Sequence, residues 1–391
     1  MSRKSFIFSL LFVSITSVKI VVADDNTNSV TQSESGVSSD NAVTEVKLLD
    51  KSKFVEESDE PYDWFPIIFY SQETNLGLGA GTMRAFQWDD NKPSPRPNSL
   101  TALAYYTLNN QYSVDIEPDL YFKNGVYNTK LIFKYSKVPS LFFGKGEQLP
   151  KDAEGEDYET NNTIVHANFI KKIVSGFRVG VSLDWQNFDV TEKQPGGLLD
   201  QPQYIGTDGG TISGLGLILD QDNRDQTFWP TKGGYHQFIA MKYSDTIGSD
   251  FDFTQYTFDL RHFITIGKSN VLALQGFALF SEGDVPFNRL AQLGGSWIMR
   301  GIYEGRYRDN HQIALQAEYR FPIKNRWLVT VFASTGDVVQ SSSDFSFSDL
   351  KYTFGGGFRY ALDPKNKLNV RMDIGISEFG IAPIIMLGEA F

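Results

Sequence analysis

The stretch KLNVRMDIGIS, residues 367–377, alternates strictly between apolar and polar side chains after its first lysine. Successive side chains of a β-strand point to opposite sides, so this alternation places all the apolar groups on one face. The same period recurs at residues 312–321 and 177–186. The three stretches therefore predict β-strands with one apolar and one polar face.

About sixteen such segments follow one another from Trp64 to the last residue, separated by polar or glycine-rich turns. An even number of antiparallel strands is typical of bacterial transmembrane barrels. Short turns at residues 123–125 and 363–365 alternate with longer connections. We expect the long loops on one side of the barrel, at residues 138–162, 190–210, 281–310 and 338–350. The expected strands are centred near Ile67, Gly79, Ala104, Asp119, Phe133, Val165, Val181, Gly216, Ile239, Phe258, Leu274, Leu315, Val331, Gly357, Val370 and Ile385.

Alternation alone fits either a soluble β-sandwich with its apolar face inside or a membrane barrel with its apolar face outside. Aromatic residues at the ends of apolar faces, such as Tyr319 and Tyr360, favour the barrel because they match interfacial girdles. The final residues, 381–391, form an apolar segment that ends in Phe391. The prediction is an all-β fold, a transmembrane antiparallel barrel over residues 62–391 whose last strand ends on Phe391.

The amino-terminal residues favour export. Arg3 and Lys4 precede an apolar run, and residues 21–23 suit signal cleavage, so residues 1–23 are predicted to be a cleaved signal peptide. Residues 24–60 hold ten acids and three lysines, a net charge of −7. Their polar composition predicts an acidic disordered tail. The expected location is the bacterial cell outer membrane.

Composition excludes several kinds of function. The chain has no cysteine, which removes disulfides and thiolate chemistry. Its four histidines lack metal-ligand spacing and no serine nucleophile motif accompanies them. The net charge of −11 argues against nucleic acid as a partner. We therefore expect no metal, no cofactor and no enzymatic activity.

Five motifs follow one another in the second half of the chain. The first is a turn with Asp222, Arg224, Asp225, Pro230 and Gly233. The others are Leu293–Gly295 with Met299–Tyr303, then Glu318–Pro322, Phe332–Asp337, and a closing signature of Gly355–Gly357, Arg371–Asp373 and Gly388–Phe391. In this order, the five motifs resemble the BamA superfamily, also called the bacterial surface antigen family.

This resemblance implies a long sixth loop folded into the lumen. The loop would be latched by Arg300 and Gly301 at its tip, with Glu318 on the inner wall as the partner of Arg300. A lumen network of Arg359, Arg371 and Asp373 is expected beside it, although a solvated ladder of charges is an equal alternative. The resemblance also makes Phe391 a carboxy-terminal signal that assembly machinery recognises.

Two motif positions depart from the family, because Ile302 and Ser334 replace an aromatic residue and an aspartate. Asp337 could compensate for Ser334, but we favour a turn-capping role. Asp222, Arg224 and Asp225 are expected to stabilise a turn rather than form a catalytic acid pair. The family's periplasmic domains need on the order of 75 residues each. The 37 residues of the tail are too few, so a barrel-only member is predicted.

The function implied is help with insertion or translocation of proteins or lipids at the outer membrane, through a weak seam between the first and last strands. The implied partners are outer-membrane lipid and either unfolded outer-membrane protein clients or a periplasmic accessory protein. The alternative is a passive channel or a structural surface antigen.

Overall fold

The computed structural model describes residues 63–88, 98–146, 152–174, 176–226, 229–324, 326–363 and 368–391. The predicted signal peptide and acidic tail lie outside the described residues.

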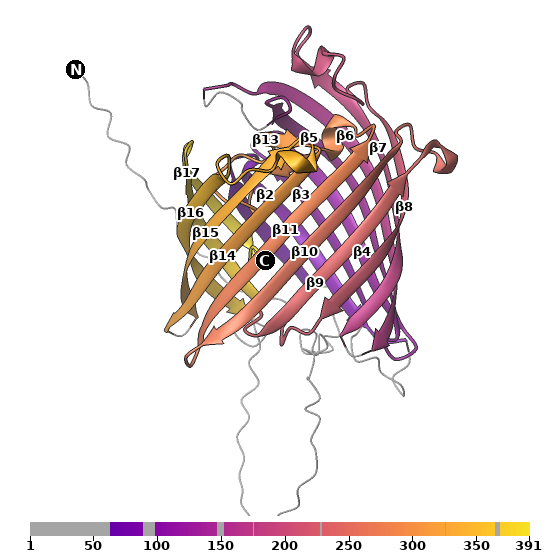
Figure 1. Cartoon of the computed structure of the whole chain (residues 1–391). Helices are drawn as coiled ribbons and strands as arrows, with labels where there is room; N and C mark the ends of the chain where they lie inside the picture. The colour runs from indigo at the N-terminus through magenta and orange to yellow at the C-terminus, as the bar shows by residue number, and fades with distance from the viewer. Residues whose placement is uncertain are drawn as a thin grey trace, which may run out of the picture. The chain divides into compact units, whose positions relative to one another are not determined.

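The described chain forms one closed antiparallel barrel of sixteen strands, which confirms the predicted fold class (Figure 1). All sixteen expected strand centres fall inside barrel strands. The strands are β1(Asp63–Ser71), β2(Asn75–Phe86), β3(Asn98–Thr107), β4(Tyr112–Phe122), β5(Tyr127–Phe142), β6(Glu156–Val174), β7(Phe177–Lys193), β8(Gly210–Asp222), β9(Gly233–Tyr243), β10(Phe253–Ile266), β11(Asn270–Gly283), β14(His311–Lys324), β15(Trp327–Val339), β16(Lys351–Asp363), β17(Leu368–Ser377) and β18(Gly380–Leu387).

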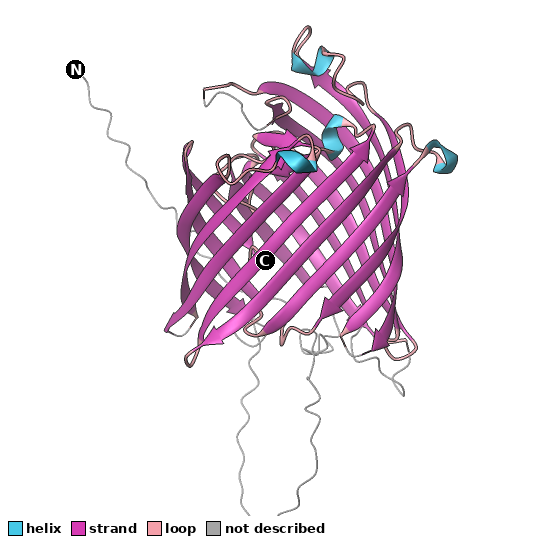
Figure 2. Cartoon of the chain, in the orientation of Figure 1, coloured by secondary structure: helices cyan, strands magenta, loops and turns pink. Residues whose placement is uncertain are grey.

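The remaining elements are short. β12(Ala291–Leu293) and β13(Tyr307–Asp309) pair with each other in a separate two-stranded sheet between β11 and β14. Four short 3-10 helices lie at the upper end of the barrel in Figure 2: η2(Leu198–Asp200), η3(Asp245–Ile247), η4(Phe287–Arg289) and η5(Ser342–Asp344). In the described ranges, no helix is both long and apolar enough to cross a membrane.

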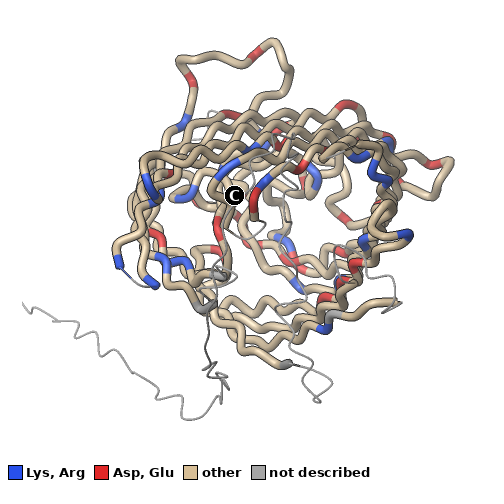
Figure 3. The backbone as a smooth tube through the Cα atoms, turned by 90° about the horizontal axis from the view of Figure 1, so that it is seen from below, with Lys and Arg blue, Asp and Glu red and all other residues tan. Residues whose placement is uncertain are grey.

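The faces of the strands are inverted relative to a soluble protein. On β14, Leu315 is 56% exposed while the neighbouring inner side chains of Gln316 and Glu318 are buried. On β17, Ile374 is 52% exposed and Asp373 is 2% exposed. Apolar groups outside and charged groups inside are the arrangement that a lipid-embedded barrel requires, because lipid cannot solvate charge. In Figure 3, charged residues occur around the ring and on segments of the chain inside it.

The long connections lie at one end of the barrel, as predicted, but they are shorter than expected. β5 continues to Phe142 and β6 begins at Glu156, inside the expected loop 138–162. β7 likewise runs to Lys193 and β15 to Val339. The prediction failed here because polar residues were read as loop, whereas beyond the hydrocarbon layer water solvates the side chains of paired strands on both faces.

The prediction for the last strand was also wrong. β18 ends at Leu387, and Gly388 adopts a left-handed φ of +82° that takes the chain out of the strand. Phe391 is only 4% exposed and packs with Phe263, Val271 and Ala273, on the inner side of β10 and β11. The last four residues therefore enter the lumen instead of extending the sheet (Figure 3).

Candidate functional site

The barrel is closed by a weak seam between β1 and β18. Among the described residues the two strands share one paired position, Tyr70 with Ile385. By contrast, β1 pairs with β2 continuously from Asp63 to Ser71. Each backbone hydrogen bond contributes about 1 kcal/mol net, and more where no water replaces it. The seam therefore costs far less to separate than any other strand pair in the barrel.

Residues 284–310, which connect β11 to β14, form the predicted sixth loop, named loop six below. Its side chains Leu293, Met299 and Ile302 are buried in an apolar cluster with Ala314 and Val338. Ala314 and Val338 belong to β14 and β15, and both are almost fully buried. Loop six therefore packs against the inner surface of the barrel.

A close backbone approach fixes the tip of loop six. Gly301 has a φ of +118°, and a Cβ atom there would lie about 3.0 Å from the backbone of Ile376. A Cβ atom on Gly375 would lie 2.6 Å from the backbone of Arg300. Ser377 donates a hydrogen bond of 2.7 Å to the carbonyl oxygen of Gly301. Glycine at positions 301 and 375 thus lets the loop tip lie directly on β17.

The structure places Arg300 between two inner carboxylates. Its Nη1 lies 2.8 Å from Glu318 of β14 and 2.6 Å from Asp373 of β17, and all three side chains have no exposed surface. The guanidinium group also stacks 3.6 Å from the centre of the Phe332 ring. A fully buried arginine with two carboxylates and an aromatic face is held in one orientation. This geometry suits a latch between the loop tip and two strands.

The predicted lumen residues come together in the same network. Arg359 lies 2.5 Å from Asp373 and 3.2 Å from Glu318. Arg371 lies 3.4 Å from Asp373. It also donates a hydrogen bond of 2.9 Å to the carbonyl oxygen of Ser296 in loop six. These side chains are buried, so they do not form the solvated ladder that was the alternative.

Two members of the network were not predicted. Arg320 lies 2.8 Å from Glu318, and Glu389 lies 2.7 Å from Arg359. The sequence carried a signal for Arg320, because its position two residues after Glu318 places both on the inner face. Glu389 carried no such signal, since the turn of the chain after β18 was not expected.

Ser334, which departs from the family motif, and Asp337, which could compensate for it, both have partners other than Arg300. The hydroxyl of Ser334 donates a hydrogen bond of 3.1 Å to Oε1 of Gln316. The same oxygen also accepts a hydrogen bond from the backbone N–H of Met299 in loop six. Asp337 lies inside β15 and pairs with Lys351 at 2.6 Å, so it neither caps a turn nor contacts Arg300. Asp373 is the second acid of Arg300 instead.

The predicted turn motif stabilises the connection between β8 and β9. Arg224 donates to both carboxylate oxygens of Asp222 at 2.9 and 3.0 Å. Asp225 accepts the backbone N–H of Thr231 at 2.8 Å. Gly233 has a φ of +90° and lies against the Asn223 carbonyl oxygen. Pro230 is buried beside these residues. The carboxylates of Asp222 and Asp225 are thus both hydrogen-bonded within the turn.

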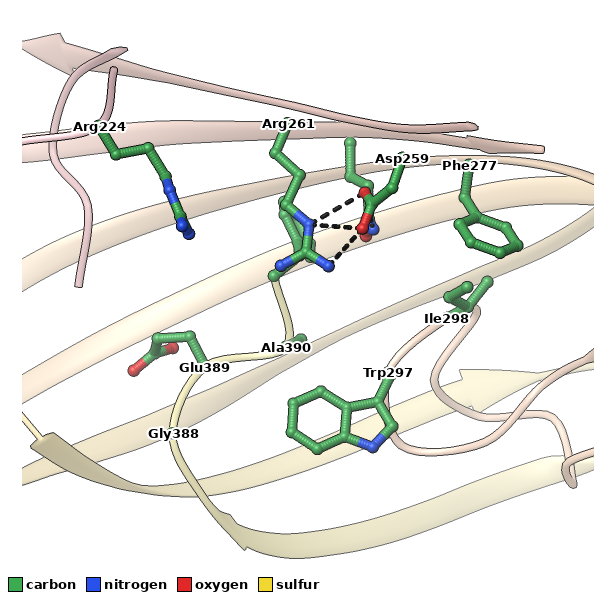
Figure 4. Close-up of a pocket in the computed structure, with 11 residues that line it drawn as sticks. Arg224, Asp259, Arg261, Phe277, Trp297, Ile298, Gly388, Glu389 and Ala390 are labelled. Carbon is green, nitrogen blue, oxygen red and sulfur yellow. Dashed lines mark hydrogen bonds and ion pairs between the residues drawn. The ribbon is translucent and has the colours of Figure 1, made fainter. Parts of the chain in front are cut away.

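The carboxy-terminal segment lines a cavity of about 310 Å³ (Figure 4). Arg224 and Arg261 lie on one side of it, and Trp297 of loop six lies on another. Arg320 donates a 2.9 Å hydrogen bond to the main-chain oxygen of Phe391. The segment 388–391 is thus tied to the arginine network by both Glu389 and Phe391.

Loop six has a second contact with the wall, far from Arg300. Arg289 donates a hydrogen bond of 2.7 Å to Asp184 of β7. Asp184 also accepts a hydrogen bond of 2.9 Å from the hydroxyl of Tyr243. Next to it, Phe287 packs edge-to-face with Phe142 and Tyr158. We call this apolar cluster the plug; its buried members are Phe142, Phe188, Leu199, Ile212, Met241, Tyr243, Phe251, Phe253, Val285, Phe287 and Leu290.

Loop six also reaches both sides of the seam at the loop end. The backbone N–H of Glu304 donates a hydrogen bond of 2.9 Å to the carboxylate of Glu73, in the turn after β1. The hydroxyl of Tyr307 donates one of 2.8 Å to the carboxylate of Glu378, in the turn before β18. Burial and this carboxylate raise the pKa of Tyr307, so its hydroxyl stays protonated and remains a donor. Loop six thus bridges the two strands that share so few bonds.

No cluster of three or more histidine, aspartate or glutamate side chains suited to a metal ion occurs in the part of the chain that the structure describes. Charged groups in the lumen pair with one another instead. The arrangement can hold a loop and a seam in place.

Together, a closed sixteen-strand barrel with an inverted exterior and a latched inner loop define a transmembrane β-barrel of the bacterial outer-membrane class. The Omp85 superfamily domain matches residues 96–373, and the chain belongs to the Omp85 superfamily. This confirms the resemblance to BamA-type barrels. None of the curated proteins matches the chain significantly in sequence.

Solved structures share the fold at low identity. BamA from Haemophilus ducreyi lacking POTRA domains 1–3 is 13% identical with a TM-score of 0.59, over 84% of this chain and 70% of that chain. CdiB from Acinetobacter baumannii is 10% identical with a TM-score of 0.54, over 84% of this chain and 59% of that chain. CdiB from Escherichia coli is 9% identical with a TM-score of 0.57, over 85% of this chain and 64% of that chain. The chain thus spans less than two thirds of either CdiB chain.

Proposed function

We propose that this barrel assists the insertion or translocation of proteins or lipids at the outer membrane, and that it does so at the seam between β1 and β18. The observation that carries the proposal is the single paired position, Tyr70 with Ile385. A strand edge with unpaired N–H and C=O groups is a template for another strand. Lipid cannot satisfy such groups, so the seam offers a client strand a favourable place to pair.

The latch supports this proposal because it separates opening from unfolding. Arg300 holds loop six to β14 and β17 on one side of the seam, while Glu73 contacts the loop on the other side. Releasing the weaker, exposed contact at Glu73 would free β1, and the buried network would keep the rest of the barrel intact. The partners needed are outer-membrane lipid and unfolded barrel clients, delivered by a periplasmic accessory protein or by the barrel's own tail. No chemical step is proposed.

A passive channel or a structural surface antigen is the alternative. The plug speaks against a wide channel, because its apolar side chains join loop six to the inner side of the wall from β5 to β10. The seam proposal and the channel alternative also differ in what a covalent lock across the seam would do.

The test is a disulfide across the seam, made with Tyr70→Cys and Ile385→Cys in a chain that has no other cysteine. Directly opposed residues in an antiparallel pair lie within disulfide reach. The matched control is Leu315→Cys with Thr335→Cys, which joins two firmly paired strands. Cells depleted of the wild-type protein would carry each variant, and outer-membrane protein levels would be surveyed with and without reductant.

The seam lock is expected to lower the levels of many outer-membrane proteins, with recovery on reduction, while the control pair has no effect. Full function of the locked barrel, together with a defect in one permeability alone when the protein is depleted, would overturn the proposal in favour of a channel.

A further inference from the structure

A cleft of about 890 Å³ lies at the loop end of the barrel, where the short turn between β3 and β4 meets the longer strands β5, β6 and β7. We call it the rim cleft. The last paired position of β4 and β5 is Tyr112 with Lys137, and β5 continues five residues further, to Phe142. The step between a low turn and a high wall creates the hollow. Its volume falls within the range of ordinary ligand sites.

The rim cleft lies just outside the hydrocarbon layer. The outward side chains of β5 change from Phe133 to Tyr135 and then to Lys137, which marks the passage from lipid to water. Tyr135 and Tyr112 lie with ring centroids 6.0 Å apart, as part of the aromatic girdle. Lys137 above them is paired with Glu159 at 2.8 Å. The cleft therefore opens at the depth of the polar headgroups.

The polar lining is acidic once its lysines are accounted for. Lys137 is neutralised by Glu159, and Lys193 is bound by Asp200 and Asp208. Among the described residues, the side chains of Asp157, Glu192 and Gln194 line the cleft without a hydrogen bond or an ion pair of their own. Unpaired carboxylates repel phosphate and sulfate, so a bare anion is a poor occupant.

The same groups fit a neutral sugar. Carboxylates accept strong, charge-assisted hydrogen bonds from hydroxyl groups, and side-chain amides both donate and accept. Gln194 supplies a free amide in the cleft. Asn109, which donates to the Glu73 carbonyl oxygen, and Asn110, which accepts from the Tyr106 hydroxyl, each keep one further amide group for a ligand. Tyr106, which is 54% exposed, offers an aromatic face to the C–H groups of a ring. We propose that the rim cleft binds neutral saccharide, carried on a glycolipid headgroup of the surrounding leaflet or free in solution.

The binding test uses the full chain in detergent, titrated calorimetrically with neutral tetrasaccharides of glucose, galactose or mannose. At least one is expected to bind with a millimolar Kd. Tyr106→Ala and the double variant Asp157→Asn with Glu192→Gln should each weaken it about tenfold. The matched control is Tyr352→Ala, an outward tyrosine that is 62% exposed on β16, far from the cleft. Heat-modifiable gel mobility verifies that each variant is folded.

A second arm separates the two sources of sugar. Hydrogen exchange of residues 106–112 and 157–159 is compared in phosphatidylethanolamine vesicles with and without an uncharged glycosyl diacylglycerol. Slower exchange with the glycolipid, lost in Tyr106→Ala, supports a glycolipid headgroup, while calorimetric binding alone supports a free saccharide. Pentalysine is titrated in parallel as a cationic peptide. The proposal is overturned if neither arm responds or if Tyr106→Ala and Tyr352→Ala behave alike. It is also overturned if pentalysine binds and no saccharide does, since the cleft would then be a site for cationic peptide.

Discussion

The seam and the wall that carries the plug are built from the same kind of alternating strand, yet they are held in different ways. β6 and β7 are paired along almost their whole length, from Tyr158 to Val174, whereas β1 and β18 share Tyr70 with Ile385. The apolar plug lies against the inner surface of the wall that contains β6 and β7. The charged network of arginines and acids lies against the inner surface of the strands near the seam. Stability is therefore concentrated away from the seam, which is the pattern expected of a structure that opens at one place.

The charged side and the apolar side should also respond differently to perturbation. Burying an ion pair is costly, but removing one partner from it is costlier still, because the other charge is left without compensation. An apolar cluster instead loses stability through the cavity left behind. Each prediction below tests one side of this contrast.

The largest effect is expected for Arg300→Ala. Glu318 and Asp373 would lose a fully buried partner, and breaking such a pair costs about 3–5 kcal/mol. We expect a lower urea midpoint and a loss of heat-modifiable gel mobility at moderate temperature. The control is Lys130→Ala, whose pair with Glu117 at 4.0 Å is 46% exposed on the lysine side and should contribute less than about 1 kcal/mol. Unchanged mobility and midpoint for Arg300→Ala would rule out the latch.

The next effect concerns the plug. Phe287→Ala removes a ring that is 1% exposed and packs with three aromatic neighbours, and such truncations cost about 3 kcal/mol. The measured loss of stability should be smaller than this, because loop six can shift into the cavity while the paired strands stay in place. We expect single-barrel conductance in planar bilayers to rise, while the disulfide between Tyr70→Cys and Ile385→Cys still forms with the same yield.

A matched substitution for this experiment is Phe347→Ala, since Phe347 is 93% exposed in the loop before β16. It should change neither conductance nor stability. If Phe287→Ala leaves conductance at the wild-type level, the plug does not close the lumen, and the contrast between the two sides loses its functional meaning.

Much of this architecture could be predicted because it depends on local alternation. All the strand centres follow from side-chain period, whereas the pairing of Arg300 with Glu318 was expected from the family resemblance. The position of Phe391 could not be predicted in this way. Its apolar neighbours Phe263 and Val271 are more than a hundred residues away in the sequence, and the turn at Gly388 gives no periodic signal.

The plug shows the same limit in loop six. Arg289 and Phe287 lie in a stretch with neither strand period nor family motif, so nothing in the sequence marked Arg289 as the partner of Asp184. Contacts between a loop and a distant wall depend on the closed barrel, which exists only after all the strands have paired. Sequence patterns are therefore informative for the wall and much less so for what fills it.

The smallest effect concerns the turn that carries Leu199 into the plug. A hydrogen bond from Lys193, then one from the Gly196 backbone N–H, lowers the pKa of Asp200. A depressed carboxyl pKa stabilises the fold fully above the unfolded value of about 4 and loses this contribution as the pH falls through the lower folded value. Protection factors for amide exchange at residues 196–201 should therefore be constant from pH 7 to pH 5 and fall below about pH 4. Asp200→Asn should show low protection at every pH, and an equal fall in that variant would assign the acid effect to other carboxylates of the plug wall.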